Sequence, residues 1–143
     1  MVAVLILVKK AGDYSDTAVL LRSVPGVGLI MAMTIITELE DIQRFGNLDS
    51  LCSYVGLVPR TNSSGDNEKI GEITPRSNRQ LRSMLVESSW IAIRQDPALM
   101  MRYGELCQRM EPNKAIIKIA KKLLSRIKHV LKNEELYEKG LVK

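Results

Sequence analysis

Residues 113–132 read NKAIIKIAKKLLSRIKHVLK, and this stretch decides the fold class. Its apolar residues recur every three or four positions, the spacing that places side chains on one face of an α-helix. Lysines fill the remaining arc, and the stretch contains no acidic residue. The pattern predicts an amphipathic helix with one face in a core and a basic face outside it. The core positions are Ile116, Ile119, Ala120, Leu123, Ile127 and Val130.

Two further helices are predicted upstream by their start signals. Thr74-Pro75 and Asp96-Pro97 each combine a side-chain oxygen that can cap free amides with a proline suited to the first turn. The first signal predicts a helix over residues 75–95, and the second a helix to about residue 110, which Glu111-Pro112 ends. The helix over 75–95 places Leu81, Leu85, Ser88 and Ala92 on one side.

Residues 56–74, GLVPRTNSSGDNEKIGEIT, form the one extended polar stretch of the chain. It contains three glycines and a proline, residues typical of turns. Loops of this length are uncommon in small domains unless they have a function, although part of this one could pair as a short β-hairpin. We therefore treat the stretch as a candidate functional loop.

The stretch LRSVPGVG (residues 21–28) has the pattern of a helix-hairpin-helix. Pro25 ends one helix, and Gly26 and Gly28 allow a tight turn. The amides of residues 26–29 are then uncovered at the start of the next helix, where the helix dipole favours an anion. An ordinary turn between two helices is the alternative. The residues predicted to hold one DNA phosphate, without reading base sequence, are Pro25, Gly26, Val27 and Gly28.

Together these segments predict an all-α fold, a compact helical bundle containing a helix-hairpin-helix and one long polar loop. Residues 29–42 continue as an apolar helix, and Asn47 can cap a short helix that runs to Tyr54. We divide the chain into an N-terminal remnant or linker, a central domain and a tail, at residues 1–19, 20–132 and 133–143. The central domain comprises the hairpin at 20–36, the loop at 56–74 and the basic helices at 75–132.

The charge of the chain is uneven. Its 143 residues have the size of one domain and a net charge of +5. Residues 1–56 hold four basic and six acidic residues, and residues 57–143 hold the remaining 17 and 10. A basic surplus suits a polyanion such as nucleic acid, because neutralised phosphates release counterions. A solvated helix face is the alternative. The basic helix residues predicted to contact DNA are Lys118, Lys121 and Lys122.

Cysteine usage and the N-terminus indicate a cytoplasmic protein without a membrane partner. Cys52 and Cys107 are too few for a disulfide scaffold and suit a reducing compartment. The apolar run at residues 2–8 precedes its lysines, the reverse of a secretory signal, and is too short to cross a bilayer.

The polar loop offers two hydroxyls, Ser63 and Ser64, beside Arg60 and Lys69. Serine attacks phosphorus only when its proton is removed and cations stabilise the developing charge. The single histidine, His129, lies in the last helix, so a Ser-His-Asp hydrolase is poorly supported. An ordinary turn is the alternative for these serines.

A row of arginines follows the loop. Arg76, Arg79 and Arg82 are spaced by three, which places them along one face of the predicted helix. Such a row could bind a backbone phosphate through paired guanidinium hydrogen bonds. A solvated helix face is again the alternative.

No metal site is predicted in this chain. Glu38, Glu40 and Asp41 cluster at a helix end, and Glu87 lies within a helix, so neither supplies the inward-facing acids of a two-metal nuclease. The cysteines lack zinc-binding spacing. The methionines expected to fill the core are Met31, Met33, Met100 and Met101.

Read in order, residues 23–60, 63–65, 71–99 and 113–124 resemble the C-terminal transposase domain of the IS116/IS110/IS902-type (insertion-sequence one-ten) family, the bridge-RNA-guided DNA recombinases. The resemblance rests on the strings SVPGVGLIMAMTIITELEDIQRFGNLDSLCSYVGLVPR, SSG, GEITPRSNRQLRSMLVESSWIAIRQDPAL and NKAIIKIAKKLL. It covers most of the chain, from about residue 20 to residue 131.

The resemblance implies a two-part enzyme. Complete members carry an N-terminal RNase-H-like domain, in which four acidic residues bind magnesium. A serine of the C-terminal domain attacks DNA and becomes covalently joined to it, and a structured guide RNA chooses the DNA sites in an oligomer. Carried over to this chain, the nucleophile is Ser64, next to the glycine, or Ser63. The implied partners are DNA, a guide RNA, and further copies or full-length transposase protomers.

The chain departs from the family in its N-terminal region. Only about 20 residues precede the hairpin, so we expect the acidic domain to be missing, no cofactor in this chain, and no cleavage by the chain alone. Ser77 also stands where the family usually has glycine. Two alternatives to a recombinase module stay open: a non-enzymatic DNA-binding module, and an oligomerisation module of a truncated transposase.

Overall fold

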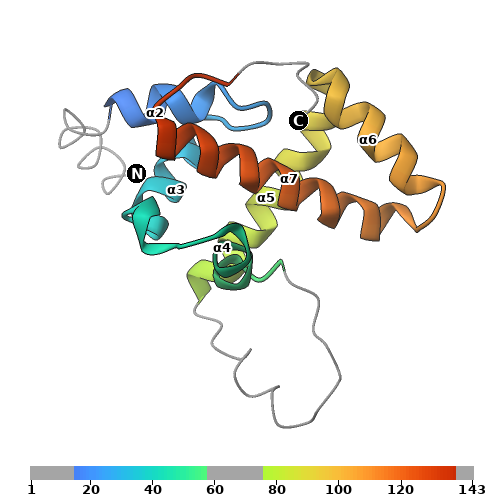
Figure 1. The fold of residues 1–143 in the computed structure, drawn as a ribbon, viewed down its shortest axis with the longest axis horizontal. Helices are drawn as coiled ribbons and strands as arrows, with labels where there is room; N and C mark the ends of the chain where they lie inside the picture. Colours follow the sequence, from blue (N-terminus) through green and yellow to red (C-terminus); the bar gives the residue numbers. More distant parts are fainter. Residues whose placement is uncertain (1–14, 58–75, 138–143) are drawn as a thin grey trace, which may run out of the picture.

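A computed structural model describes residues 15–57 and 76–137 (Figure 1). All regular elements in these ranges are helical, which confirms the predicted all-α fold class. None of these helices combines the length and apolar character needed to cross a bilayer. Residues 1–14, most of the polar stretch and its suggested β-hairpin lie outside the described residues. The elements are α2 (Ser15–Arg22), α3 (Leu29–Leu39), the 3-10 helix η1 (Ile42–Arg44), α4 (Leu48–Val55), α5 (Arg76–Gln95), α6 (Pro97–Cys107) and α7 (Pro112–Asn133).

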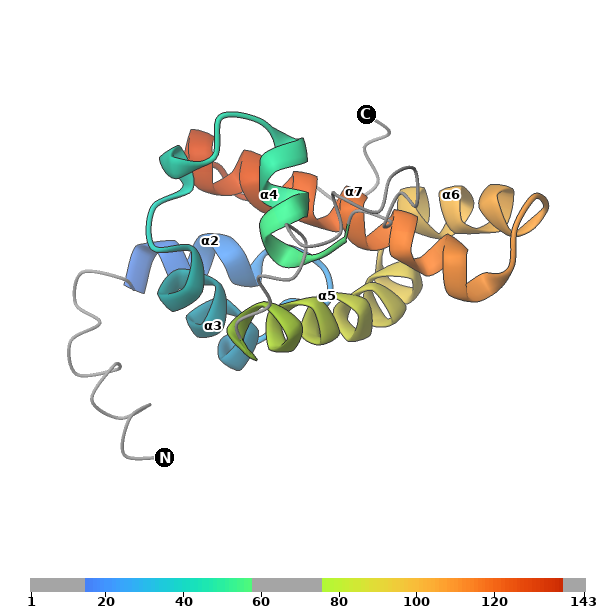
Figure 2. The same ribbon diagram turned by 90° about the horizontal axis from the view of Figure 1, so that it is seen from below.

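Helix α7 is the centre of the fold. It contacts α2, η1, α4, α5 and α6, and Figure 2 shows it running along the molecule beside α4. All the apolar positions predicted for its inner face are buried, and Ile119 and Leu123 have no exposed surface. Each such leucine or isoleucine stabilises the fold by about 1.5–3 kcal/mol. The predicted amphipathic pattern of this helix is confirmed.

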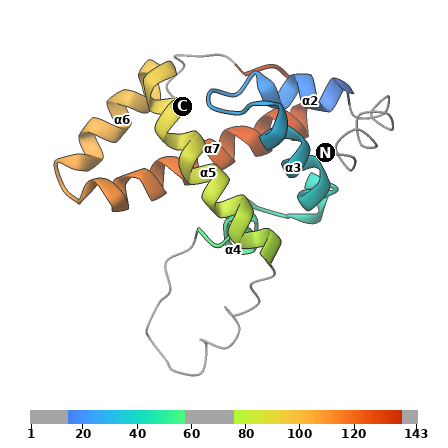
Figure 3. The ribbon, with the colours of Figure 1, turned by 180° about the vertical axis from the view of Figure 1, so that it is seen from behind.

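Helix α5 carries the second predicted inner face. Leu81, Leu85 and Ala92 are buried, and Ser88 lies among them at 5% exposure. The neighbouring Ser89 hydroxyl is also buried and donates to the Leu85 carbonyl at 2.7 Å, so this polar group is satisfied inside the core. Through this face α5 packs against α3, α4, α6 and α7 (Figure 3).

The predicted helix starts that fall in the described residues are confirmed. The Asn47 side chain accepts a hydrogen bond from the Ser50 amide at 2.8 Å and caps α4. Asp96 caps α6 by accepting from the Ala98 amide at 3.0 Å, with proline in the first turn. Thr74, the predicted cap of α5, lies outside the described residues.

Two predicted helix ends differ from the structure. The apolar helix at residues 29–42 ends at Leu39, because Glu40 adopts a positive φ of 56° and Asp41 starts η1 by accepting from the Gln43 amide. Helix α6 ends at Cys107 instead of residue 110, and residues 108–110 form turns that close on the last carbonyls of α6.

The prediction that all four methionines fill the core is half wrong. Met31 and Met33 are buried, whereas Met100 and Met101 are 50% and 63% exposed. Helix α6 buries Leu99 and Leu106, which are two turns apart on one face, and the two methionines fall outside that face.

The segment after α7 returns to the other end of the chain. The Tyr137 amide donates to the Ser23 hydroxyl at 2.9 Å, and the Tyr137 hydroxyl donates to the Asp96 carboxylate. Asp96 is only 1% exposed, and its carboxylate accepts hydrogen bonds from the Ala98 amide and the Tyr137 hydroxyl inside the protein. This residue of the tail therefore connects the end of α2 to the start of α6.

Tyr137 gives the fold a testable pH dependence. Burial and the hydrogen bond to Asp96 raise the pKa of the Tyr137 phenol, against the lowering effect of Arg126. Because the native state holds this proton more tightly, the stabilisation is complete below about pH 10 and is lost as the pH rises further. We expect the free energy of unfolding of the wild type to fall more steeply between about pH 10 and 11.5 than that of Tyr137→Phe. Urea unfolding followed by Trp90 fluorescence measures the free energy of unfolding of both proteins at each pH. If the two free energies fall in parallel as the pH rises, the raised pKa of Tyr137 is contradicted.

Candidate nucleic-acid interface

The turn between α2 and α3 is closed by its own backbone. Pro25 and Val27 are buried, and the Val27 amide donates to the Val24 carbonyl at 3.1 Å. Gly26 adopts a φ of +84°, a conformation that favours glycine. Gly28 is extended and exposed, and its carbonyl accepts the first α3 hydrogen bond, from Ala32 at 2.9 Å.

Gly26 faces α5 and not solvent. A Cβ atom on this residue would lie 2.3 Å from the Ser88 carbonyl oxygen, and the Gly26 amide donates to the Gln95 side chain at 3.2 Å. The side of this glycine that a Cβ would occupy is therefore taken by α5. Its missing side chain lets the turn pack on the α5 backbone.

The four amides expected to be uncovered divide into two pairs. Those of Gly26 and Val27 have partners inside the protein. Those of Gly28 and Leu29 donate no hydrogen bond within the residues that the structure describes. A Cβ on Gly28 would meet nothing within 4 Å, so the space beside this residue is open. The side chains beside them are apolar, with Leu29 and Ile30 44% and 61% exposed.

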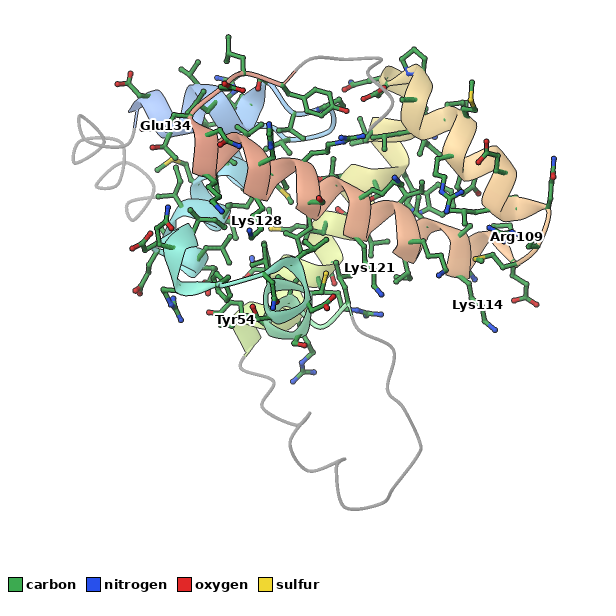
Figure 4. The ribbon with its side chains drawn as sticks, in the orientation of Figure 1. Tyr54, Arg109, Lys114, Lys121, Lys128 and Glu134 are labelled. Carbon is green, nitrogen blue, oxygen red and sulfur yellow. The ribbon has the colours of Figure 1, made fainter. Side chains whose placement is uncertain are left out.

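The outer face of α7 carries a row of lysines, here called the lysine stripe. Figure 4 shows Lys114 and Lys121 pointing to the side of α7 on which α4 lies. Helix α7 contains no acidic residue, and no ion pair joins a stripe lysine to an acid in the described ranges. The members, which share one face by their spacing, are Lys114, Lys118, Lys121, Lys128 and Lys132.

The stripe passes close to α4. The positive charge of Lys121 lowers the pKa of the buried Cys52 thiol on α4, and the charge of Asp49 raises it. Burial dominates and raises the pKa of the Cys52 thiol, so this cysteine is neutral at pH 7. Cys52 is a core residue, and the positive charge of Lys121 is presented beside α4.

Lys122 lies off the stripe, in the middle of α7 on the side that faces α6. It is half-buried and lines a hollow of about 80 Å³ between the two helices. This volume is too small for a nucleotide base, so the hollow does not define a nucleic-acid pocket. The lining residues are Ala98, Leu99, Met101, Arg102, Glu105, Lys122 and Arg126.

Arg79 and Arg82 are exposed in the first half of α5. Arg82 also lies against the end of α4, since a Cβ on Gly56 would lie 3.6 Å from its Cδ atom. The two arginines therefore lie where α4 leads into the serine-containing stretch and α5 follows it. The backbone of Arg76 starts α5. The remaining predicted loop residues, Arg60, Ser63, Ser64 and Lys69, lie outside the described residues.

The structure separates the predicted phosphate contacts into two places. Gly26 lies against the Ser88–Gln95 half of α5, whereas Arg79 lies near the other end. Figure 3 shows the α2–α3 turn beside the end of α5 that joins α6, and α4 beside the opposite end. A rise of 1.5 Å per residue puts Arg79 and Gln95 about 24 Å apart along the helix. The turn and the arginines cannot bind the same phosphate.

The acidic residues singled out in the sequence lie mainly on the surface of the described part of the chain. The carboxylates of Glu40 and Asp41 are exposed at the end of α3, and Glu87 is exposed on α5. Within the described ranges, no group of three or more histidine, cysteine, aspartate or glutamate side chains could hold a metal ion. His129 is exposed, and its Nδ1 atom lies 3.0 Å from the Asn133 amide nitrogen.

Sequence reasoning missed the residues that hold the turn. Gln95 and Tyr137 contact it from 69 and 114 positions away in the chain. No local pattern marks Gln95. The signal available for Tyr137 was that it is the one aromatic residue of the tail.

These features define a small all-α domain whose basic face has no ion-pair partner among the described residues, and comparison with known proteins identifies its family. The model described as "Transposase IS116/IS110/IS902 family" matches residues 18–104. The chain belongs to this family.

Curated relatives extend the match. The chain is 30% identical over 123 residues to the "Transposase for insertion sequence element IS1111A" of Coxiella burnetii, covering 83% of this chain and 34% of that protein. It is 32% identical over 120 residues to the "Insertion element IS110 uncharacterized 43.6 kDa protein" of Streptomyces coelicolor, covering 82% and 29%. It therefore spans about a third of the length of these relatives. No solved structure matches the chain significantly.

Proposed function

We propose that this chain is a DNA-binding module of an IS110-family transposase, and that its basic face follows the phosphate backbone. The observation that carries the proposal is the lysine stripe. Its lysines lie on a helix whose opposite face is fully buried, and no acid in the described ranges pairs with them. Free cations on a fixed helix neutralise phosphates and release condensed counterions, which favours binding independent of base sequence.

The α2–α3 turn supplies a second contact in this proposal. The free amides of Gly28 and Leu29 at the start of α3 can donate to one phosphate, aided by the helix dipole. In this proposal, these two amides make the phosphate contact that was predicted for the helix-hairpin-helix. The distance of about 24 Å along α5 corresponds to about seven base steps of 3.4 Å, so the turn and the arginines bind different phosphates.

The catalytic part of the proposal concerns the loop serine. Ser64, or Ser63, acts as the strand-transfer nucleophile in the complete enzyme, as the family resemblance implies. The support from this chain is the pair of exposed arginines, Arg79 and Arg82, beside the ends of the loop, because guanidinium groups stabilise the charge that develops on phosphorus. Arg60, Lys69 and Arg76 are assigned to the same region.

Other components belong to the complete enzyme in this proposal. They are the guide RNA, the partner protomers in the cytoplasm, and magnesium. The described residues offer no cluster that fits a metal ion.

Salt dependence tests the basic face. We expect the 143-residue chain to bind a fluorescein-labelled duplex weakly, with affinity falling steeply as salt rises. Lys118→Ala and Lys121→Ala should each lower the slope of log K against log salt by about one, and weaken binding by about 3- to 10-fold near 0.1 M salt. Fluorescence anisotropy at four salt concentrations measures both quantities.

The matched control is Arg109→Ala. Arg109 is exposed after the end of α6 and lies outside the stripe, so its substitution removes the same charge from another place. For Arg109→Ala, the slope of log K against log salt should stay within about 0.3 of the wild-type slope. If all three variants lose affinity equally, net charge and not the stripe determines binding.

A further inference from the structure

Three hydrogen bonds tie the α2–α3 turn to the α5–α6 junction and the tail. The Gly26 amide donates to Gln95 at 3.2 Å, and the Tyr137 amide donates to the Ser23 hydroxyl at 2.9 Å. The Tyr137 hydroxyl donates to Asp96, which follows Gln95 in the chain. The tail therefore links the start of the turn to the helix junction on which the turn rests.

Both contacts of Tyr137 are made to groups that are already fixed. Asp96 is 1% exposed and caps α6 through the Ala98 amide, so its carboxylate cannot rotate freely. The Ser23 hydroxyl donates to the Leu20 carbonyl at 2.6 Å, which orients its lone pairs towards the Tyr137 amide. Tyr137 thus bridges the last turn of α2 and the first turn of α6.

The turn is anchored unevenly. Pro25 and Val27 are buried, whereas Gly28 and Leu29, which carry the candidate phosphate-binding amides, are exposed. A segment with little side-chain packing gains affinity when another contact fixes its bound conformation, because less ordering is left for the binding step.

We propose that Tyr137 is a positioning residue for the α2–α3 turn, and that it thereby sets the affinity of the Gly28 and Leu29 amides for a DNA phosphate. The inference rests on the proposed DNA-binding function. It adds a role for the tail, which holds the turn in the conformation that binds.

Tyr137→Phe tests this role with little change in packing, because it keeps the ring and removes the hydroxyl. Tyr54→Phe is the matched control. Its hydroxyl donates to the Glu38 carbonyl at 3.1 Å, from α4 to the end of α3, and makes no contact with the turn. Both variants lose one tyrosine hydrogen bond, but only Tyr137→Phe loses a bond that links the tail to the α5–α6 junction.

The first measurement is a double-mutant cycle on duplex affinity by fluorescence anisotropy. We expect Tyr137→Phe to weaken binding by about 3- to 10-fold and Tyr54→Phe by less than about 2-fold. We expect the methyl group of Gly28→Ala to hinder close approach of a phosphate to this backbone, so in that background the Tyr137→Phe effect should disappear. An equal loss in both backgrounds, or no loss in either, would overturn the proposal, since a general loss of stability acts on both alike.

The second measurement needs no DNA. Hydrogen exchange of the Gly26 and Val27 amides should accelerate by about 10-fold or more in Tyr137→Phe, with the inner amides of α7 unchanged. If the wild-type chain fails to bind DNA, the proposed function fails, while faster exchange still supports the positioning of the turn by Tyr137. Unchanged exchange at both amides overturns the role of Tyr137 whatever the DNA result.

Discussion

Replacing Gly26 by alanine is expected to lower the free energy of unfolding by about 3–5 kcal/mol. The added Cβ would lie 2.3 Å from the Ser88 carbonyl oxygen, a backbone atom that cannot move without shifting α5. The φ of +84° costs about 1–2 kcal/mol for a residue with a side chain, and overpacking adds about 1–3 kcal/mol. A shifted turn also loses the hydrogen bond from the Gly26 amide to Gln95.

Thermal unfolding measures this effect. Trp90, the single tryptophan, packs edge-on against Tyr103 with ring centroids 5.8 Å apart and reports on the junction of α5 and α6. We expect the Tm of Gly26→Ala to fall by about 10 °C or more, and the far-ultraviolet dichroism to report the same midpoint if unfolding is two-state.

Gly28→Ala is the control for this prediction. Its Cβ would meet nothing within 4 Å, and its φ of −96° is open to any residue, so its stability should change by less than about 1 kcal/mol. Equal stability of the two alanine variants would show that the turn does not pack on α5 in solution.

The sequence predicted those elements whose side chains follow one period. In α7 and α5 the apolar residues face a single core, so spacing alone identified Leu123 and Leu85 as buried. Asn47 and Asp96 were found as caps because a cap is a local hydrogen bond between neighbouring residues.

The orientation of the α2–α3 turn could not be predicted in this way. The sequence shows that Gly26 allows a turn, but whether the open side of the glycine meets a phosphate or a helix depends on tertiary packing. Ser88 of α5 occupies that side, and Gln95 takes the amide. Contacts between residues so far apart in the chain leave no local periodicity. Met100 and Met101 were wrongly predicted to be buried for a related reason. A methionine in a helix does not by itself indicate which face of the helix packs into the core.

The largest functional effect is expected at the loop serine, and it concerns a complete enzyme. A suitable protein is a chimera in which this chain replaces the matching segment of the Coxiella burnetii relative, over the 123 aligned residues. In the proposed reaction the serine oxygen bonds to phosphorus and the bond from phosphorus to the strand's own oxygen breaks. That oxygen leaves with the proton given up by the serine, and the protein stays joined to the DNA. Ser64→Ala should reduce this covalent adduct by about 1000-fold or more, because no other group at that position supplies the attacking oxygen. Denaturing gel electrophoresis with end-labelled DNA detects the adduct.

Ser63→Ala separates the neighbouring hydroxyl from the nucleophile. It should retain the adduct within about 10-fold, and mass spectrometry of the DNA-linked peptide should place the modification on Ser64. Loss with Ser63→Ala alone assigns the chemistry to Ser63, and an adduct that survives the double substitution rejects a loop-serine nucleophile.

Arg82→Ala in the same chimera should slow adduct formation by about 10- to 100-fold while duplex affinity falls less, because a charge beside the reacting phosphate contributes more as charge develops on it. An equal loss in rate and affinity would mean that Arg82 only binds the backbone, and the catalytic site would then have to draw its cations from elsewhere in the enzyme.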